Sequence, residues 1–90
     1  MEDFSIIYKG TLTTQDTTIF DNPKGCIVKN VMMYNTQAQS VQVNLSFDDV
    51  LFIIELQANE FKKLDILPFT QKITCNGGGV NIHVSGLAIT

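Results

Sequence analysis

The side chain best suited to acid–base chemistry is the single histidine of the sequence, His83. It stands in the outward phase of an alternating segment, beside Asn81 and Ser85. Catalysis by a histidine needs a nucleophile or a carboxylate within hydrogen-bond reach, and a distant group such as Asp65 can supply one only through the fold. We therefore expect a solvated or interface histidine on a polar strand face.

A second candidate is Glu55, which stands among Ile53, Ile54 and Leu56. Burial of a carboxylate raises its pKa, and many catalytic acids are made in this way. A glutamate in such surroundings more often marks the place where the far face of a strand meets water or a neighbouring subunit. We expect the second arrangement here.

Two short motifs could bind ions but lack the residues that would complete a site. Asp48-Asp49 offers carboxylate oxygens, yet a calcium site needs six or more oxygen ligands, and no DxDxDG-like spacing surrounds the pair. Gly77-Gly78-Gly79 has the composition of a phosphate cradle, but such loops precede a helix and are often followed by GK[ST]. Both motifs are typical of tight hairpin turns. We expect no metal, no cofactor and no enzyme activity.

The two cysteines, Cys26 and Cys75, form no CxxC motif and have no neighbouring histidine, so zinc lacks a ligand set. A disulfide between them is compatible with the sequence. The N-terminus Met1-Glu2-Asp3 is acidic, where a secretory signal would be basic and then apolar. We therefore expect no export by the standard route, and two reduced, buried thiols.

The charge balance argues against nucleic acid as a direct partner. The chain holds nine Asp and Glu, six Lys and no Arg, and its basic pair is Lys62-Lys63. Nucleic-acid backbones are bound by clustered cations, and phosphate recognition favours the Arg fork. The longest apolar run, Val50–Ile54, is far shorter than the roughly 20 residues that span a bilayer. We expect no membrane partner either.

β-branched residues predict a chain of strands. Ile, Val and Thr make up 26 of the 90 residues, and their stiff side chains fit a pleated surface better than a helix. Turn residues recur at the spacing expected of a sandwich or barrel. The pattern predicts eight strands: Ser5–Thr14, Thr17–Asp21, Cys26–Tyr34, Val41–Phe47, Val50–Gln57, Phe61–Leu67, Lys72–Asn76 and Val80–Thr90.

Three of these segments allow more specific predictions. Val41–Phe47 alternates strictly between apolar and polar side chains, which is typical of a half-buried strand. Val50–Gln57 is apolar on both faces in its middle, which predicts a central strand. In Val80–Thr90 the inward phase slips at Ser85-Gly86, which predicts a β-bulge centred on Gly86.

The whole pattern predicts one all-β domain over residues 1–90. Asn22-Pro23-Lys24-Gly25 is a predicted turn, because Pro presets φ at its second position and Gly closes it. No segment shows a helical stripe of apolar residues. About eight antiparallel strands in a chain of this length indicate a two-layer, jelly-roll-like β-sandwich, with a flattened barrel as the alternative.

The outward positions are unusually rich in uncharged polar side chains. The chain holds seven Asn, six Gln and nine Thr, which hydrogen-bond well and carry no repulsive charge. Such faces suit protein–protein packing or polar ligands such as glycans. An ordinary β surface is the other reading, since such a surface must be polar somewhere.

Several motifs stand in order along the chain: Gly10-Thr-Leu-Thr-Thr14, Thr17-Thr-Ile-Phe20, Pro23-x-Gly25, Ile27-Val-Lys-Asn-Val31, Asn35-Thr36 and Gly78-Gly-Val-Asn-Ile-His-Val-Ser-Gly86. Over roughly residues 8 to 87, this order resembles a small β-sandwich module of tailed-bacteriophage structural proteins. That module has a GTLTT-like opening, a P-x-G turn, an I-K-x-I…N-T strand and a closing GGVNVxxSG. It often has a Gly-Asp turn before the penultimate strand, where this chain has Pro68-Phe-Thr-Gln71, so that loop and its contacts depart from the pattern.

The resemblance implies a virion or tail component that assembles with copies of itself and is made in the cytoplasm of an infected bacterium. It implies no catalytic residue. The first expectation is therefore a tail, tail-tip or capsid-decoration subunit that forms a homo-oligomer and contacts other virion proteins. The alternative is a carbohydrate-binding module that attaches the particle to a host glycan. Its candidate contacts are Tyr8, Tyr34 and Phe69, with His83 as a further interface residue.

Overall fold

The structure is a computed structural model that describes residues 5–65 and 68–89 of the chain. The predicted strand ends at Ile66-Leu67 and at Thr90 lie outside the described residues. Over the described ranges the chain forms antiparallel strands and no helix. The strands are β1 (Ser5–Thr11), β2 (Thr17–Asn35), β3 (Val41–Phe47), β4 (Val50–Leu56), β5 (Phe61–Asp65), β6 (Phe69–Asn76) and β7 (Val80–Ala88).

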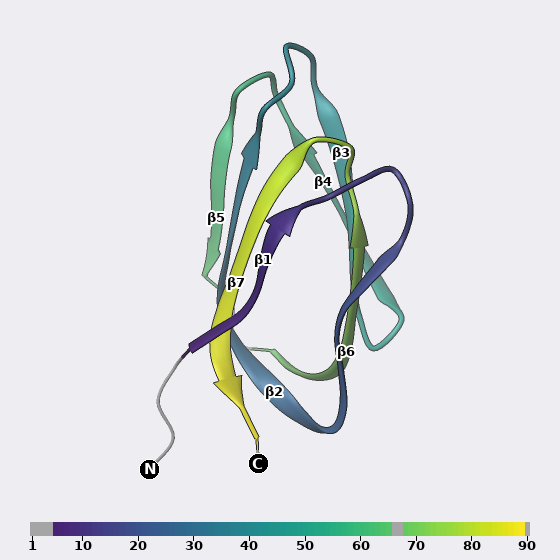
Figure 1. The fold of residues 1–90 in the computed structure, drawn as a ribbon, viewed down its shortest axis with the longest axis vertical. Coiled ribbons are helices and arrows are strands. Elements are labelled where there is room, and N and C mark those ends of the chain that lie inside the picture. The colour runs from purple at the N-terminus through teal and green to yellow at the C-terminus, as the bar shows by residue number, and fades with distance from the viewer. Residues whose placement is uncertain (1–4, 66–67, 90) are drawn as a thin grey trace.

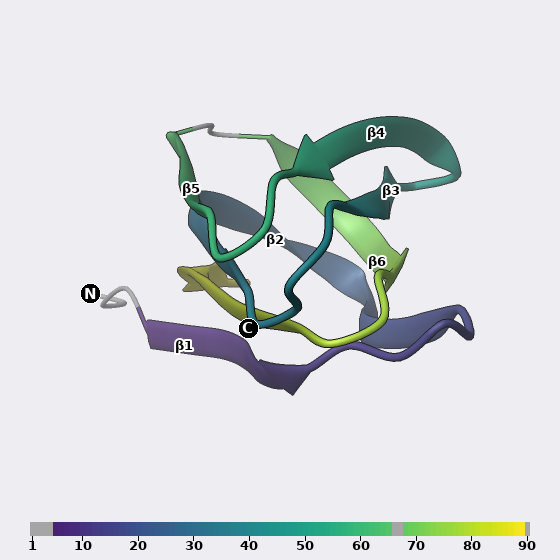
Figure 2. The same ribbon diagram turned by 90° about the horizontal axis from the view of Figure 1, so that it is seen from above.

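The strands form two layers that share β2. The order of pairing is β1-β7-β2-β6-β3-β4, and β5 also pairs with β2. The first part of β2 pairs with β6, while its second part lies between β7 and β5. One layer therefore contains β1, β7 and β5, the other contains β6, β3 and β4, and β2 passes from one to the other (Figures 1 and 2). The predicted all-β sandwich is confirmed.

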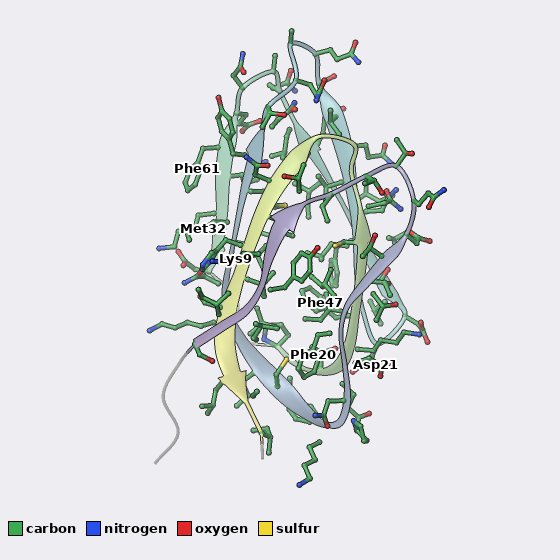
Figure 3. The ribbon with its side chains drawn as sticks, viewed as in Figure 1. Lys9, Phe20, Asp21, Met32, Phe47 and Phe61 are labelled. Carbon is green, nitrogen blue, oxygen red and sulfur yellow. The ribbon has the colours of Figure 1, made fainter. Side chains whose placement is uncertain are left out.

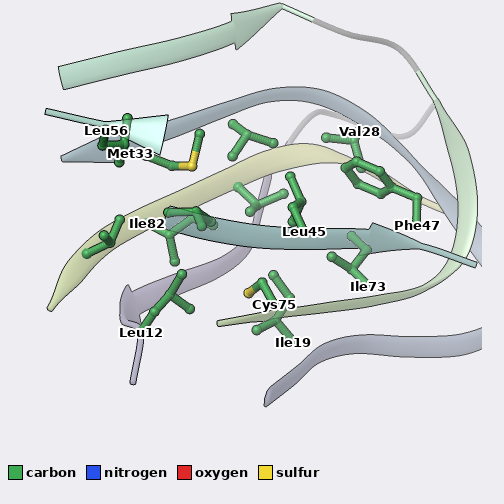
Figure 4. Close-up of a cluster of buried hydrophobic side chains, with 14 of the residues drawn as sticks. Leu12, Ile19, Val28, Met33, Leu45, Phe47, Leu56, Ile73, Cys75 and Ile82 are labelled. Atoms are coloured by element: carbon green, nitrogen blue, oxygen red, sulfur yellow. The ribbon is translucent and has the colours of Figure 1, made fainter. Parts of the chain in front are cut away.

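The core fills the space between the layers (Figure 4). Alternate residues of β3, β6 and β7 point into it, because successive side chains of a strand point to opposite faces. Its fully buried residues also include Met33 of β2 and Leu56 at the end of β4. The buried apolar set is Leu12, Ile19, Cys26, Val28, Val31, Met33, Val43, Leu45, Phe47, Leu56, Ile73, Cys75, Val80, Ile82 and Val84.

The prediction of eight strands is wrong by one. The segments Thr17–Asp21 and Cys26–Tyr34 belong to the single strand β2, and Asn22–Gly25 is a sharp bend inside it (Figure 1). The register against β6 shifts between Asp21 and Cys26. The Asn22 side-chain oxygen accepts the N–H of Lys24 at 2.9 Å, and Gly25 has a φ of 83°. The predicted turn at Asn22–Gly25 is therefore present. It bends β2 from one layer into the other and does not separate two strands.

The prediction that Val50–Gln57 is a central strand is wrong. β4 pairs with β3 on one side, and no second partner strand lies beside it in the part of the chain that the structure describes. A strand that is apolar on both faces has the same sequence pattern whether it is buried centrally or stands at an edge. Only the order of the strands separates the two cases.

The bulge predicted at Gly86 lies in the neighbouring strands. β7 keeps an unbroken register, whereas β2 has an extra residue between Val28 and Asn30 and β1 has one between Ile6 and Tyr8. Gly86 allows this arrangement because a Cβ there would overlap the carbonyl oxygen of Ile27 and lie 3.0 Å from the Cα of Val28. A glycine at this position lets the backbones of β7 and β2 approach closely.

Of the two predicted hairpins, one is confirmed and one is wrong. Asp48 and Asp49 connect β3 to β4 with φ values of 50° and 69°, the left-handed pair that a two-residue hairpin turn requires. The segment Gly77–Gly79 joins β6 to β7, which lie in different layers and do not pair. It is a crossing between layers, held by hydrogen bonds of Gly77 N–H to Thr13 O and of Gly79 N–H to Leu12 O.

Candidate functional site

The four candidate contact residues do not gather at one place. Tyr8 is half-buried and packs against the core. Tyr34 and His83 line the same hollow on the outer face of the β1–β7–β2–β5 layer. Phe69 is 57% exposed and borders a different cleft beside β4. The structure therefore brings Tyr34 and His83 together and places Tyr8 and Phe69 at other sites.

The outer hollow holds about 650 Å³ and is open to solvent. Strand pairing places Lys9 and Met32 on either side of His83, and Tyr34 pairs with Phe61 across β2 and β5. Figure 3 shows Lys9, Met32 and Phe61 along this side of the molecule. The outer hollow is lined by Lys9, Gly10, Thr11, Met32, Met33, Tyr34, Phe61, Asn81, Ile82 and His83.

His83 has no catalytic partner among the described residues. Its Nδ1 atom is buried and finds no hydrogen-bond partner there. Asp65, the distant carboxylate considered from the sequence, lies on β5, two strands away, and contacts Lys63 Nζ at 3.5 Å. The polar groups nearest along the hollow are already bonded to one another, since Thr11 Oγ1 donates to Asn81 Oδ1 at 2.7 Å. The arrangement offers hydrogen-bonding groups and two aromatic rings to a ligand.

The carboxylate of Asp48 supports the fold. Its Oδ1 accepts the main-chain N–H groups of Gln71 at 2.9 Å and of Lys72 at 3.0 Å. The main-chain N–H of Asp48 in turn donates to Lys72 O at 3.0 Å. These bonds fix the β3–β4 hairpin onto β6. Across residues 5–65 and 68–89, no three His, Cys, Asp or Glu side chains gather in a way that could hold a metal ion.

The two thiols are free and buried, as predicted, and they lie apart. Cys26 lies opposite Thr70 and Cys75 lies opposite Thr17 in the β2–β6 pair, so five residues of β6, roughly 17 Å, separate them. Burial, with a smaller contribution from Asp48, raises the pKa of Cys26 to about 11. Burial, with a smaller contribution from Asp16, raises the pKa of Cys75 to about 11. Both thiols are therefore protonated and unreactive near neutral pH.

The feature that sequence reasoning missed is an exposed apolar surface on β4. Val50, Leu51, Phe52 and Ile53 are 57%, 54%, 51% and 60% exposed. We call these four residues the β4 edge patch. Glu55 follows on the same strand, where it is exposed and accepts a hydrogen bond from Gln57 Nε2 at 2.9 Å. Its predicted position, facing water or a neighbour, agrees with this exposure.

An apolar cleft of about 770 Å³ continues from the β4 edge patch toward the other layer. The ring of Phe52 packs edge-on against Phe47, with ring centroids 6.0 Å apart. Phe69 adds a further half-exposed ring at the rim of the cleft. Leu64 of β5 lines it from the opposite layer, and Pro68, just before β6, lines it as well. Both faces of the strand therefore carry exposed apolar side chains.

The run Val50–Ile54 was the only sequence signal of this surface. It marked an apolar strand correctly, but its exposure depends on the neighbouring strands. None of the described residues forms a helix that could span a bilayer. No protein-family model and no curated protein sequence matches this chain.

Proposed function

We propose that this chain is a structural subunit of a tailed-phage particle that acts through contacts with copies of itself and with other virion proteins. The observation that supports assembly is the β4 edge patch. Large exposed apolar patches on soluble proteins commonly mark interaction surfaces. A sheet edge with unpaired backbone groups and apolar side chains is also a template for pairing with another chain.

The contrast among the three edge strands strengthens this reading. β5 contains Lys62, Lys63 and Asp65, and β1 contains Lys9 and an irregularity between Ile6 and Tyr8. Charges and bulges of this kind keep an edge from pairing with other chains. The middle of β4 has neither. Of the edges in the described ranges, β4 is the one without such protection.

Covering this surface contributes favourably to association. Fully burying a side chain of this size stabilises by about 1.5–3 kcal/mol, so covering a half-exposed one contributes about 1 kcal/mol. Four such side chains from each of two copies therefore contribute about 8 kcal/mol toward the cost of association.

The placement in a particle, as a tail, tail-tip or capsid-decoration subunit made in the host cytoplasm, is supported by the motif resemblance from Gly10 to Gly86. Light scattering coupled to size exclusion at micromolar concentration tests the assembly. We expect a mass above that of the 10.0 kDa monomer, and a strict monomer would count against the proposal. Antibodies raised against the chain should decorate purified particles of the phage that encodes it.

The outer hollow supports a second candidate function, attachment to a host glycan. Tyr34 and Phe61 are 39% and 58% exposed there, Tyr34 pairs with Asn81 across β2 and β7, and His83 lines the same hollow. Sugar sites combine aromatic faces with a few polar groups in this way. Binding on a glycan array that is lost in Tyr34→Ala and kept in Phe69→Ala would support this function, and no binding to any array or cell-wall preparation would dismiss it.

A further inference from the structure

The free edge of β4 has a definite set of unpaired backbone groups. In the two-residue hairpin, Phe47 and Val50 exchange both of their main-chain hydrogen bonds. Partners then alternate, so Val50, Phe52, Ile54 and Leu56 bond to β3. The hydrogen bond from Asp48 N–H to Lys72 O agrees with this alternation, because it places the other set of β3 groups toward β6.

The N–H and C=O groups of Leu51, Ile53 and Glu55 consequently point away from β3, into the plane beyond the free edge of the sheet. Their side chains project from the outer face, where Leu51 and Ile53 are exposed. An added antiparallel strand must pair its own outward groups with these three residues. That requirement leaves few registers for a second β4.

Two criteria distinguish these registers: whether like charges lie opposite each other, and how much of β4 is paired. Pairing centred on Phe52 places Glu55 opposite Asp49 of the other copy, and pairing centred on Glu55 places the two Glu55 residues opposite each other. Like charges directly opposite in a sheet are destabilising. Pairing centred on Ile54 leaves part of β4 unpaired. Pairing centred on Ile53, the middle residue of Val50–Leu56, overlaps the whole strand.

We propose that two copies of this chain join by antiparallel pairing of β4 with β4 about a two-fold axis at Ile53, an inference that rests on the proposed function. Leu51 then lies opposite Glu55 of the second copy, and the two Glu55 residues are roughly 13 Å apart along the strands. Ile53, the most exposed residue of the β4 edge patch at 60%, meets its own counterpart at the axis. The two β6–β3–β4 layers become one continuous sheet.

The two-fold axis also places the apolar inner faces of both copies on the same side of the joined sheet, because it stands perpendicular to that sheet. Val50 and Phe52 of one copy then continue the apolar row of the other, beside the cleft that Phe69 borders. Such an interface uses the same patch on both subunits, which closes a dimer. A second copy therefore fits both the backbone and the side chains of this edge.

Cysteine cross-linking tests the register. Directly opposite hydrogen-bonded residues have Cα atoms about 5.5 Å apart, within the range that a disulfide spans. Ile53→Cys should therefore give a covalent dimer on mild oxidation, seen on a non-reducing gel. Leu51→Cys and Glu55→Cys should each cross-link poorly alone and efficiently when the two variants are mixed. Ile6→Cys, 53% exposed on the protected edge β1, is the matched control for random collision.

Two substitutions test the edge by light scattering. Ile53→Lys should weaken dimerisation about ten-fold or more, whereas Ile6→Lys should leave it unchanged. Ile53→Pro removes an outward N–H, a position where an edge strand accepts proline, so its circular dichroism should stay native while the dimer is lost. Phe52→Pro removes a hydrogen bond to β3 and should unfold the hairpin.

The outcomes separate this inference from the proposed function. A wild-type oligomer that survives Ile53→Lys and shows no faster cross-linking at Ile53 than at Ile6 would overturn the β4 pairing and leave self-assembly standing. A wild-type chain that is monomeric at all concentrations tested would overturn both the β4 pairing and self-assembly. The β4 edge patch would then be a surface for a different partner protein. Cross-linking at Ile53 and in the Leu51 and Glu55 mixture, with monomers from Ile53→Pro, would establish the register.

Discussion

The side-chain amide of Asn35 donates a 3.2 Å hydrogen bond to the main-chain carbonyl of Leu56, and both residues are completely buried. The same amide lies 2.8 Å from Gln39 O and 3.0 Å from Gln57 O. Its Oδ1 accepts the N–H of Gln37 at 2.9 Å. One buried side chain thus ties the end of β2 to the loop before β3 and to the end of β4, the strand that bears the apolar edge.

Replacing this amide should destabilise the protein. Asn35→Ala removes the amide's contacts with three main-chain carbonyls and the acceptor of the Gln37 N–H, so we expect a loss of about 2–3 kcal/mol in the free energy of unfolding. Asn35→Asp keeps an acceptor for Gln37 but removes the donor, and should lose at least as much. Urea unfolding followed by circular dichroism measures both. Gln39→Ala is the control, because its main-chain carbonyl remains; an equal loss there would contradict the assigned role.

The hairpin that presents β4 should depend on Asp48 more than on Asp49. Both residues have positive φ, so replacement by alanine strains the turn similarly at each position. Only Asp48 also accepts the N–H groups of Gln71 and Lys72. We expect Asp48→Ala to lose about 1–3 kcal/mol more than Asp49→Ala in chemical unfolding. Equal losses would mean that the carboxylate bonds contribute nothing.

Gly86 should tolerate no side chain. A Cβ there would overlap Ile27 O in the adjacent strand, where backbone rather than a flexible side chain must move. Gly86→Ala should therefore lose about 3 kcal/mol or more. Gly78→Ala is the matched control, since its nearest atom is the Thr14 Cγ2 methyl at 3.1 Å and its φ is not positive. Thermal unfolding of the two variants should differ clearly, and similar midpoints would refute the close approach at Gly86.

Alkaline pH should weaken the fold through the two thiols. The pKa values of Cys26 and Cys75 rise from 9.0 to about 11 on burial. The folded state thus holds these protons more tightly than the unfolded chain, and their contribution to stability is complete below pH 9.0 and is lost as pH rises toward about 11. Urea unfolding across this interval should show a shallower decline in Cys75→Ala than in the wild type.

Thiol reactivity gives an independent measurement of the same burial. A disulfide reagent should modify Cys26 and Cys75 slowly in the native protein and rapidly in urea, because a buried, protonated thiol is a poor nucleophile. The exposed thiol of Ile6→Cys, kept reduced until the reagent is added, gives the rate for an accessible site. Rapid modification of the native wild type would show that the core opens readily.

Local sequence was enough to place most of the extended segments and one turn. The alternation of Val41–Phe47 predicted β3 with its observed bounds, because a strand's two faces repeat every two residues whatever lies beside them. The Asp48-Asp49 turn followed from residues that tolerate positive φ. The strand and the turn depend on interactions between residues close together in the chain. The buried thiols were expected from the acidic N-terminus and from the usual burial of free cysteines.

Tertiary structure decided which strands are neighbours, and with that the candidate surfaces. The apolar run Val50–Ile54 would read the same in a central strand, but β4 stands at an edge and exposes it. Gly77–Gly79 resembles a hairpin turn, yet β6 and β7 both pair with β2 and lie in separate layers. Tyr34 and His83 meet in one hollow while Phe69 lies elsewhere, because each position is set by pairing between residues far apart in sequence.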